Sequence, residues 1–486
     1  MSDEFEERQT VVEDDHSAEA NEPISSTSDL EQEKKRVAHE FYAQGNTATT
    51  QIFIGHLGSM NLDSWQKNGA LSTSPASQVY SLHTRQGCQE FVERYKNSEH
   101  LAVAIVLSVF KLVYLGDLHE LEELLMEELP DVAPTEGNAP PTWDPYTSID
   151  TYLSAIGGKR FTSQEGKQYV GLGEGAQKAL QNIWEQFFGL RNSICRWLVM
   201  LSRSYKTRTA FDAYQIVCAF ARVVCLDFDD AQKRIFSRLY STSENVGLLG
   251  NLVCKLYEEA SFRGKLEELL LGWLGARGSW LWRPACLACS YLMPGMDERR
   301  FGPALERAVG CQLNSLTKNN STFLAILMLQ SKYFRNLLAR LLGRMVRRAC
   351  SREERLAAAQ TYLYLLRSCY YLVDDQRPEL PLVACDAKEQ QETLTSVLAE
   401  VMGYAGLRKQ LYAILRVYLK ELDRYQYSDG LFNHLCAYFY NLTLAAPTCW
   451  PDIIEFLSGV QGESGKRLYA YMLSEYRGSR QLPSPS

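Results

Sequence analysis

The chain repeats the phrase Phe334-Arg335-x-x-Leu338-x-x-Leu341-Leu342 four times with small changes. The other copies are Leu190-Arg191-x-x-Ile194-x-x-Trp197-Leu198, Phe262-Arg263-x-x-Leu266-x-x-Leu269-Leu270 and Leu407-Arg408-x-x-Leu411-x-x-Ile414-Leu415, and successive copies begin 72, 72 and 73 residues apart. Apolar residues spaced i, i+4, i+7 and i+8 share one face of an α-helix. A fixed period is typical of repeat proteins, in which stacked units bury such faces against one another. The sequence therefore predicts an all-α fold, an α-solenoid of about four 72-residue multi-helix repeats.

One arginine stands at the second position of every copy: Arg191, Arg263, Arg335 and Arg408. An arginine that recurs once per repeat is expected to bridge adjacent repeats, by donating to carbonyls at helix ends or by pairing with a carboxylate. We therefore predict a repeat-stacking role for these four residues.

The composition is that of a folded protein, with 46% hydrophobic and 22% charged residues. A net charge of −7 argues against a protein coated with positive charge for nucleic acid. Most of the 13 Cys lie in apolar helical stretches, where they behave as small hydrophobes. The polar, acidic start does not look like a secretory leader, and the longest apolar run, Leu101 to Val109, is too short to span a bilayer. We predict a cytoplasmic protein with no membrane span.

Changes in composition divide the chain into seven predicted segments. Residues 1–40 are acidic and poor in aromatic residues, which predicts disorder. In chain order, the remaining segments are a β-prone motif at 41–62, a linker at 63–83, a small helical unit at 84–130, a Pro-rich linker at 131–149, a HEAT-like helical repeat array at 150–478 and a disordered end at 479–486.

No stretch of the chain carries a complete catalytic, cofactor or metal-binding motif. The stretch from Gly459 to Lys466 resembles a phosphate-binding loop, but five residues separate its outer glycines and Arg467 replaces the required Ser or Thr. Cys286-x-x-Cys289 lacks a second pair of ligands, so a packing role is favoured. We predict a non-enzymatic protein that needs no cofactor.

A basic stripe is the main candidate binding feature. Arg340, Arg344, Arg347 and Arg348 recur at helical spacing opposite a row of leucines. One interpretation is a solvated face that pairs with acidic residues of a neighbouring helix, such as Glu267, Glu268 or Asp374. The other is an anion-binding ridge for phosphate backbones or an acidic partner segment.

Two tryptophans near a glycine-rich turn are candidate partner anchors. Trp280 and Trp282 follow Gly275 and Gly278, which favour a turn. An exposed tryptophan in a turn can anchor a partner protein, whereas a buried one belongs to the core. The sequence leaves both interpretations open.

The β-prone motif contains the uncharged run Gln51-Ile52-Phe53-Ile54-Gly55. Short, uncharged segments rich in β-favouring residues can stack in cross-β fashion. The run resembles amyloid-type signalling motifs of necroptosis adaptors and bacterial immune receptors, although Phe53 and Gly58 stand where Gln and Asn are usual. This resemblance implies self-assembly through the N-terminal segment; the alternative is a hairpin docked on the first helical unit.

A second resemblance concerns the general layout. The helical stretch Cys88 to Pro130, followed by an array with turns such as Gly275-Ala-Arg-Gly-Ser-Trp280, is similar to the sensor halves of bacterial NACHT/STAND-type conflict proteins, without their ATPase core. The resemblance implies an accessory or sensor protein in bacterial antiviral defence. We therefore expect a scaffold that binds a partner protein through its array, and the alternative is a nucleic-acid-binding protein that uses Arg340–Arg348.

Overall fold

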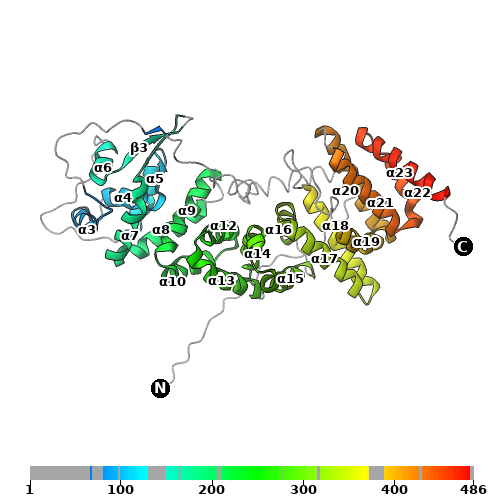
Figure 1. The fold of residues 1–486 in the computed structure, drawn as a ribbon, viewed down its shortest axis with the longest axis horizontal. Helices are drawn as coiled ribbons and strands as arrows, with labels where there is room; N and C mark the ends of the chain where they lie inside the picture. Colours follow the sequence, from blue (N-terminus) through cyan, green and yellow to red (C-terminus); the bar gives the residue numbers. More distant parts are fainter. Residues whose placement is uncertain are drawn as a thin grey trace, which may run out of the picture.

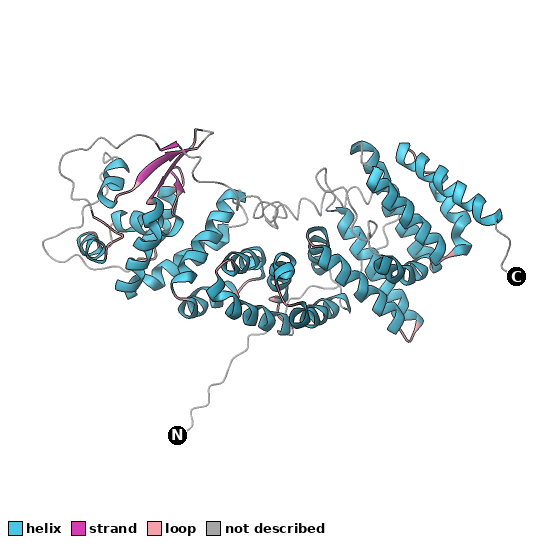
Figure 2. Ribbon diagram, in the orientation of Figure 1, coloured by secondary structure: helices cyan, strands magenta, loops and turns pink. Residues whose placement is uncertain are grey.

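The computed structural model describes residues 66–67, 80–96, 99–129, 149–163, 166–204, 210–276, 278–314, 318–371, 388–425 and 429–481. Within these residues the fold is all-α with one small sheet (Figure 2). The helices follow one another along an arch, with the sheet at one end and the last helix at the other (Figure 1).

The N-terminal end of the arch combines short helices with the sheet. Its elements are β1 (Gln66–Lys67), α3 (Arg85–Arg94), α4 (Glu99–Phe110), β2 (Val113–Tyr114), α5 (Leu118–Met126), α6 (Ile149–Ile156), β3 (Lys159–Thr162), β4 (Gln168–Gly171) and α7 (Ala176–Gln186). Helix α4 is apolar all round and is buried from Leu101 to Phe110, because α5, α7 and α9 pack around it. Thr84 caps α3 by accepting a hydrogen bond from the amide of Gly87 at 3.1 Å.

The sheet is antiparallel, with strand order β1-β3-β4-β2. β3 and β4 form a hairpin in which Lys159 pairs with Gly171 and Thr162 with Gln168. Gly166 in the hairpin loop has φ of 79°, a left-handed conformation that glycine adopts without strain. These strands lie at 159–171, inside the segment that the sequence analysis assigned to the helical array.

The array itself is a succession of helices. Its elements are α8 (Phe188–Ser204), α9 (Ala210–Leu226), α10 (Phe228–Ala231), the π-helical η3 (Gln232–Phe236), α11 (Ser237–Leu239), α12 (Val246–Tyr257), α13 (Arg263–Gly275), α14 (Trp282–Leu292), α15 (Glu298–Asn314), α16 (Lys318–Gln330), α17 (Lys332–Arg348), α18 (Arg352–Tyr371), α19 (Lys388–Gly403), α20 (Ala405–Tyr425), α21 (Asp429–Ala445), α22 (Trp450–Ser458) and α23 (Glu463–Gln481). Short 3-10 turns stand at Gly173–Gly175, Ser243–Asn245, Ala260–Phe262, Met293–Gly295 and Pro447–Cys449.

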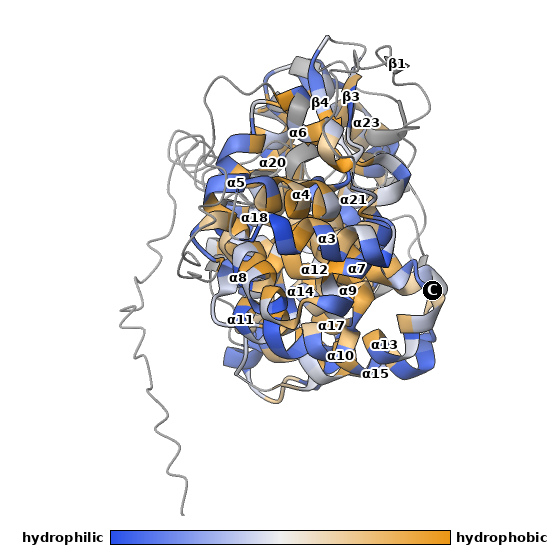
Figure 3. Ribbon diagram, turned by 90° about the vertical axis from the view of Figure 1, so that its left-hand side faces the viewer, coloured by the Kyte–Doolittle hydropathy of each residue, from blue (hydrophilic) through white to orange (hydrophobic). Residues whose placement is uncertain are grey.

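These helices pack in two rows. The inner row lies on the concave side of the arch and runs α9, α12, α14, α16, α18, α20 and α23, each packed on the next (Figure 1). The outer row contains α13, α15, α17, α19 and α21, with α8 and the α10–α11 segment before them. Apolar residues from Tyr80 to Met472 form one continuous core. Figure 3 views the molecule from one end and colours each residue by its hydropathy.

The four copies of the recurring phrase do not occupy equivalent places in these rows. The first three lie on α8, α13 and α17 in the outer row, whereas the fourth lies on α20 in the inner row. Three helices separate α13 from α17, but within the described residues only α18 and α19 separate α17 from α20. The phrase therefore occurs on helices of both rows that bury one face, and the 72-residue repeat stays a prediction.

Candidate functional site

An open groove of about 1040 Å³ lies where the outer-row helices α13, α15 and α17 meet the starts of α14 and α18. Its floor is apolar: Leu274, Trp282 and Leu341 line it and are all buried, and the half-buried Met345 lies beside them. Helical periodicity explains this floor, because Leu341 and Met345 are four residues apart on α17. The groove thus joins residues from five helices, α13, α14, α15, α17 and α18.

The rim of the groove carries charged side chains from α15, α17 and α18. Arg307 comes from α15, Arg344 and Arg348 from α17, and Glu306 and Glu354 complete the rim. Arg344 and Arg348 are one helical turn apart, so they project from one face of α17. Arg307, Arg348 and Glu354 are exposed.

Glu306 is held by two arginines of the basic stripe. Its carboxylate lies 2.9 Å from Nη2 of Arg344 and 3.6 Å from Nη2 of Arg340. This pairing agrees with the interpretation in which the stripe faces acidic residues of a neighbouring helix, but Glu306 was not among the partners suggested from the sequence. Glu267 binds Arg300 at 2.8 Å instead. Asp374 lies outside the described residues, and no ion pair within them involves Glu268.

The remaining two arginines of the rim have no acidic partner within the described part of the chain. Arg348 forms no side-chain ion pair there, and Arg307 makes only a long contact of 3.4 Å from Nε to the carbonyl of Pro303. Glu354 forms no ion pair with either arginine in the described part of the chain; its carboxylate accepts the amide of Ser351 at 3.3 Å, and the Ser351 hydroxyl accepts the amide of Glu354 at 3.1 Å. This capping box begins α18. The rim therefore presents uncompensated positive charge.

The fourth arginine of the stripe points elsewhere. Arg347 is exposed and does not line the groove. The stripe predicted from sequence is thus divided. Arg344 and Arg348 line the groove, whereas Arg340, which pairs with Glu306, and Arg347 do not.

Trp282 does not fit the predicted role of an exposed anchor. It is only 5% exposed, and its ring packs edge-on against Phe323 with centroids 5.3 Å apart. The reason is that α14 begins at Trp282, which places the ring between helices. Trp280 is half-buried and packs against the core.

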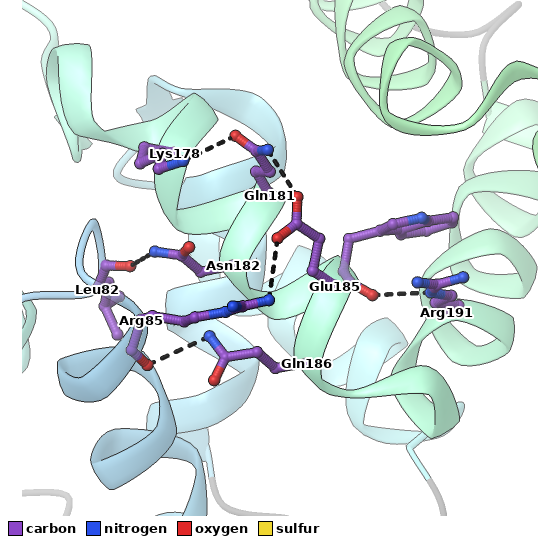
Figure 4. A network of polar contacts seen from close by, with 9 residues as sticks. Leu82, Arg85, Lys178, Gln181, Asn182, Glu185, Gln186 and Arg191 are labelled. Atoms are coloured by element: carbon purple, nitrogen blue, oxygen red, sulfur yellow. Dashed lines mark hydrogen bonds and ion pairs between the residues drawn. The ribbon is translucent and has the colours of Figure 1, made fainter.

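The four recurring arginines share one hydrogen-bonding pattern. Each donates to a carbonyl in the last turn of the helix before it. Arg191 binds the carbonyl of Trp184 at 2.7 Å, Arg263 that of Tyr257 at 3.1 Å, Arg335 that of Met328 at 2.9 Å and Arg408 that of Met402 at 2.9 Å. Carbonyls at helix ends lack partners within their helix, so these bonds stabilise the turn between successive helices. Figure 4 shows this bond between Arg191 of α8 and the last turn of α7.

A carboxylate of the protein itself binds the glycine-rich stretch from Gly459 to Lys466. It leads into α23, whose N-terminal amides would attract an anion. Asp423 of α20 supplies that anion, because its Oδ1 accepts the amide of Ser464 at 2.6 Å. In this structure, the stretch that resembles a phosphate loop is the start of α23, which Asp423 caps.

The described cysteines and acidic residues form no metal centre. Cys286 and Cys289 are fully buried, and burial raises the pKa of both thiols. Within the ranges described above, no three His, Cys, Asp or Glu side chains lie close enough to share a metal ion. None of the helices in those ranges has the length and apolarity to traverse a bilayer. The predicted assembly motif, Gln51 to Gly55, lies outside the described residues.

Comparison of the chain with known protein families, with curated proteins and with solved structures gives no match. The groove was only partly visible in the sequence. Glu306 and Arg307 were missed because their importance depends on α15 lying beside α17. An acidic and a basic residue adjacent on an amphipathic helix were the available signal.

Proposed function

We propose that this protein is a non-enzymatic scaffold that binds a partner protein through its helical array. The observation that carries the proposal is the groove, which five helices of the array build on one continuous core and which pairs an apolar floor with a charged rim. Apolar centres surrounded by polar rims are typical of protein–protein interfaces.

The test is an affinity purification of the tagged full-length protein from its native cells, with and without nuclease. We expect a stoichiometric protein partner that survives nuclease treatment. Recovery of nucleic acid alone, with nothing left after nuclease, would refute the scaffold proposal.

The alternative function, nucleic-acid binding by Arg340–Arg348, has less support. Glu306 pairs with Arg340 and Arg344 and offsets one of their two positive charges, so less charge remains to neutralise phosphates. This alternative requires affinity that falls steeply with salt, and charge reversal at Arg344 and Arg347 should weaken binding to every sequence alike.

Self-assembly through residues 41–62 and a role in bacterial antiviral defence complete the proposal, and both rest on the sequence resemblances. Deletion of residues 41–62 should abolish higher-order assembly and leave the helical fold intact. A wild-type protein that stays monomeric at high concentration would remove the assembly function.

A further inference from the structure

The groove already holds one carboxylate, and that carboxylate shows which chemistry it accepts. Glu306 lies between Arg344 and Arg340, with its oxygens 2.9 and 3.6 Å from their nitrogens. Guanidinium groups bind carboxylates through charge-assisted hydrogen bonds. A second acidic side chain entering the groove would find Arg307 and Arg348, which are exposed at the same rim.

The size of the groove favours a peptide chain over a small molecule. Its volume of about 1040 Å³ exceeds what a small molecule fills, and it is open to solvent. The apolar floor of Leu274, Trp282 and Leu341 offers contact to aliphatic or aromatic side chains. Acidic side chains on either side of such a residue would lie at the basic rim.

Nucleic acid fits this arrangement poorly. Glu306 and Glu354 belong to the same rim and offset part of its positive charge, so little net charge remains for a backbone that carries a phosphate at every nucleotide. Sequence-independent phosphate binding needs several uncompensated cations along a track, whereas the described rim has Arg307 and Arg348.

We propose that this groove binds an extended segment of the partner protein in which acidic residues flank an apolar one. The proposal rests on the proposed scaffold function and names the site and the chemistry of the bound segment. Arg307 and Arg348 bind the acidic side chains, and the floor around Trp282 receives the apolar one.

The test compares two double variants of the full-length chain. The groove variant carries Arg307→Glu and Arg348→Glu. The control variant carries Arg299→Glu and Arg347→Glu, which change the same two helices by the same charge at exposed positions that do not line the groove. Circular dichroism first checks that both variants are folded.

A display library of random peptides is selected on the wild-type chain, and recovered peptides are labelled with fluorescein for anisotropy measurements. We expect recovered sequences enriched in Asp and Glu around an apolar residue. Binding should weaken roughly tenfold in the groove variant, because two attractive pairs become repulsive, and less than about threefold in the control. Recovered peptides without acidic enrichment, or equal losses in both variants, would overturn the proposal.

A labelling experiment on the wild-type chain tests the same site without the groove variant, in case that variant fails to fold. Cys311 is exposed and lines the groove. Bound peptide should slow its reaction with maleimide, and unchanged labelling would count against this site. If a peptide of residues 1–33 outcompetes every recovered peptide, the occupant is the chain's own acidic tail, which overturns a partner-derived segment.

The native partner separates this inference from the scaffold proposal. A partner captured by wild type and lost by the groove variant supports both. A partner that the groove variant retains overturns the groove assignment alone, whereas a wild-type chain that captures no protein refutes the scaffold proposal.

Discussion

Replacement of Glu122 by Gln should stabilise the N-terminal end of the arch at high pH and leave it unchanged at low pH. Glu122 on α5 is only 3% exposed. The pKa of its carboxyl is raised to about 7, chiefly by burial and also by the nearby Glu99, while the contact with His119 at 3.5 Å opposes the rise.

The sign follows from proton binding. In the unfolded chain this carboxyl ionises near its ordinary pKa of 4.5, so between pH 4.5 and about 7 the folded state binds the proton more tightly. The free energy of unfolding therefore decreases as pH rises through this window and stays lower above it. Since one pKa unit corresponds to about 1.4 kcal/mol, the loss has an upper limit of about 3 kcal/mol.

Gln has the same shape as the protonated acid and does not ionise, so Glu122→Gln should remove this loss. Hydrogen exchange of the α4 and α5 amides, measured by mass spectrometry at pH 5 and pH 8 after correction for intrinsic rates, reports the local stability. Glu123→Gln is the matched control, because Glu123 also contacts His119, at 3.2 Å, but is 66% exposed. Equal protection in the two variants, or a gain that is the same at both pH values, would refute the reasoning.

Three further predictions concern the array. Arg335→Met should lower the free energy of unfolding by about 1–3 kcal/mol, because the carbonyl of Met328 loses a charged donor; thermal denaturation against Arg347→Met measures this, and equal melting temperatures would contradict it. Gly462→Ala should destabilise the α23 end, since Gly462 has φ of 112° and a Cβ there would overlap the carboxylate of Asp423; unchanged hydrogen exchange of α23 would count against this. Among the described thiols, the exposed Cys311 and Cys350 should react with maleimide first and the buried Cys286 only on unfolding, as peptide mapping of the labelled protein would show.

The sequence predicted the helices better than their arrangement. The apolar spacing in the recurring phrase depends only on burial of one helix face, so it identified α8, α13, α17 and α20 correctly as helices. It could not distinguish the rows, because a helix of either row buries one face. The sheet escaped detection because β1 and β2 have two residues each and β3 and β4 have four.

The same limit applies to the groove. Helical spacing was enough to place Arg344 and Arg348 on one face of α17, since that relation is local. The choice of Glu306 as the counterion of Arg344 depends on a contact across 38 positions of the chain. The sequence did not decide whether Trp282 is exposed or buried, because the nearby glycines favour a turn and the start of α14 at Trp282 could not be located.

The two-row packing makes the curvature of the arch sensitive to the angles between neighbouring helices. Each helix has its main contacts with its nearest neighbours. Small rotations between adjacent helices therefore add up along the arch and change the distance between its two ends. A segment seated across α13, α15 and α17 would fix the angles among three of these helices. The curvature of the whole arch, and with it the separation of the sheet from α23, would then depend on what occupies one groove.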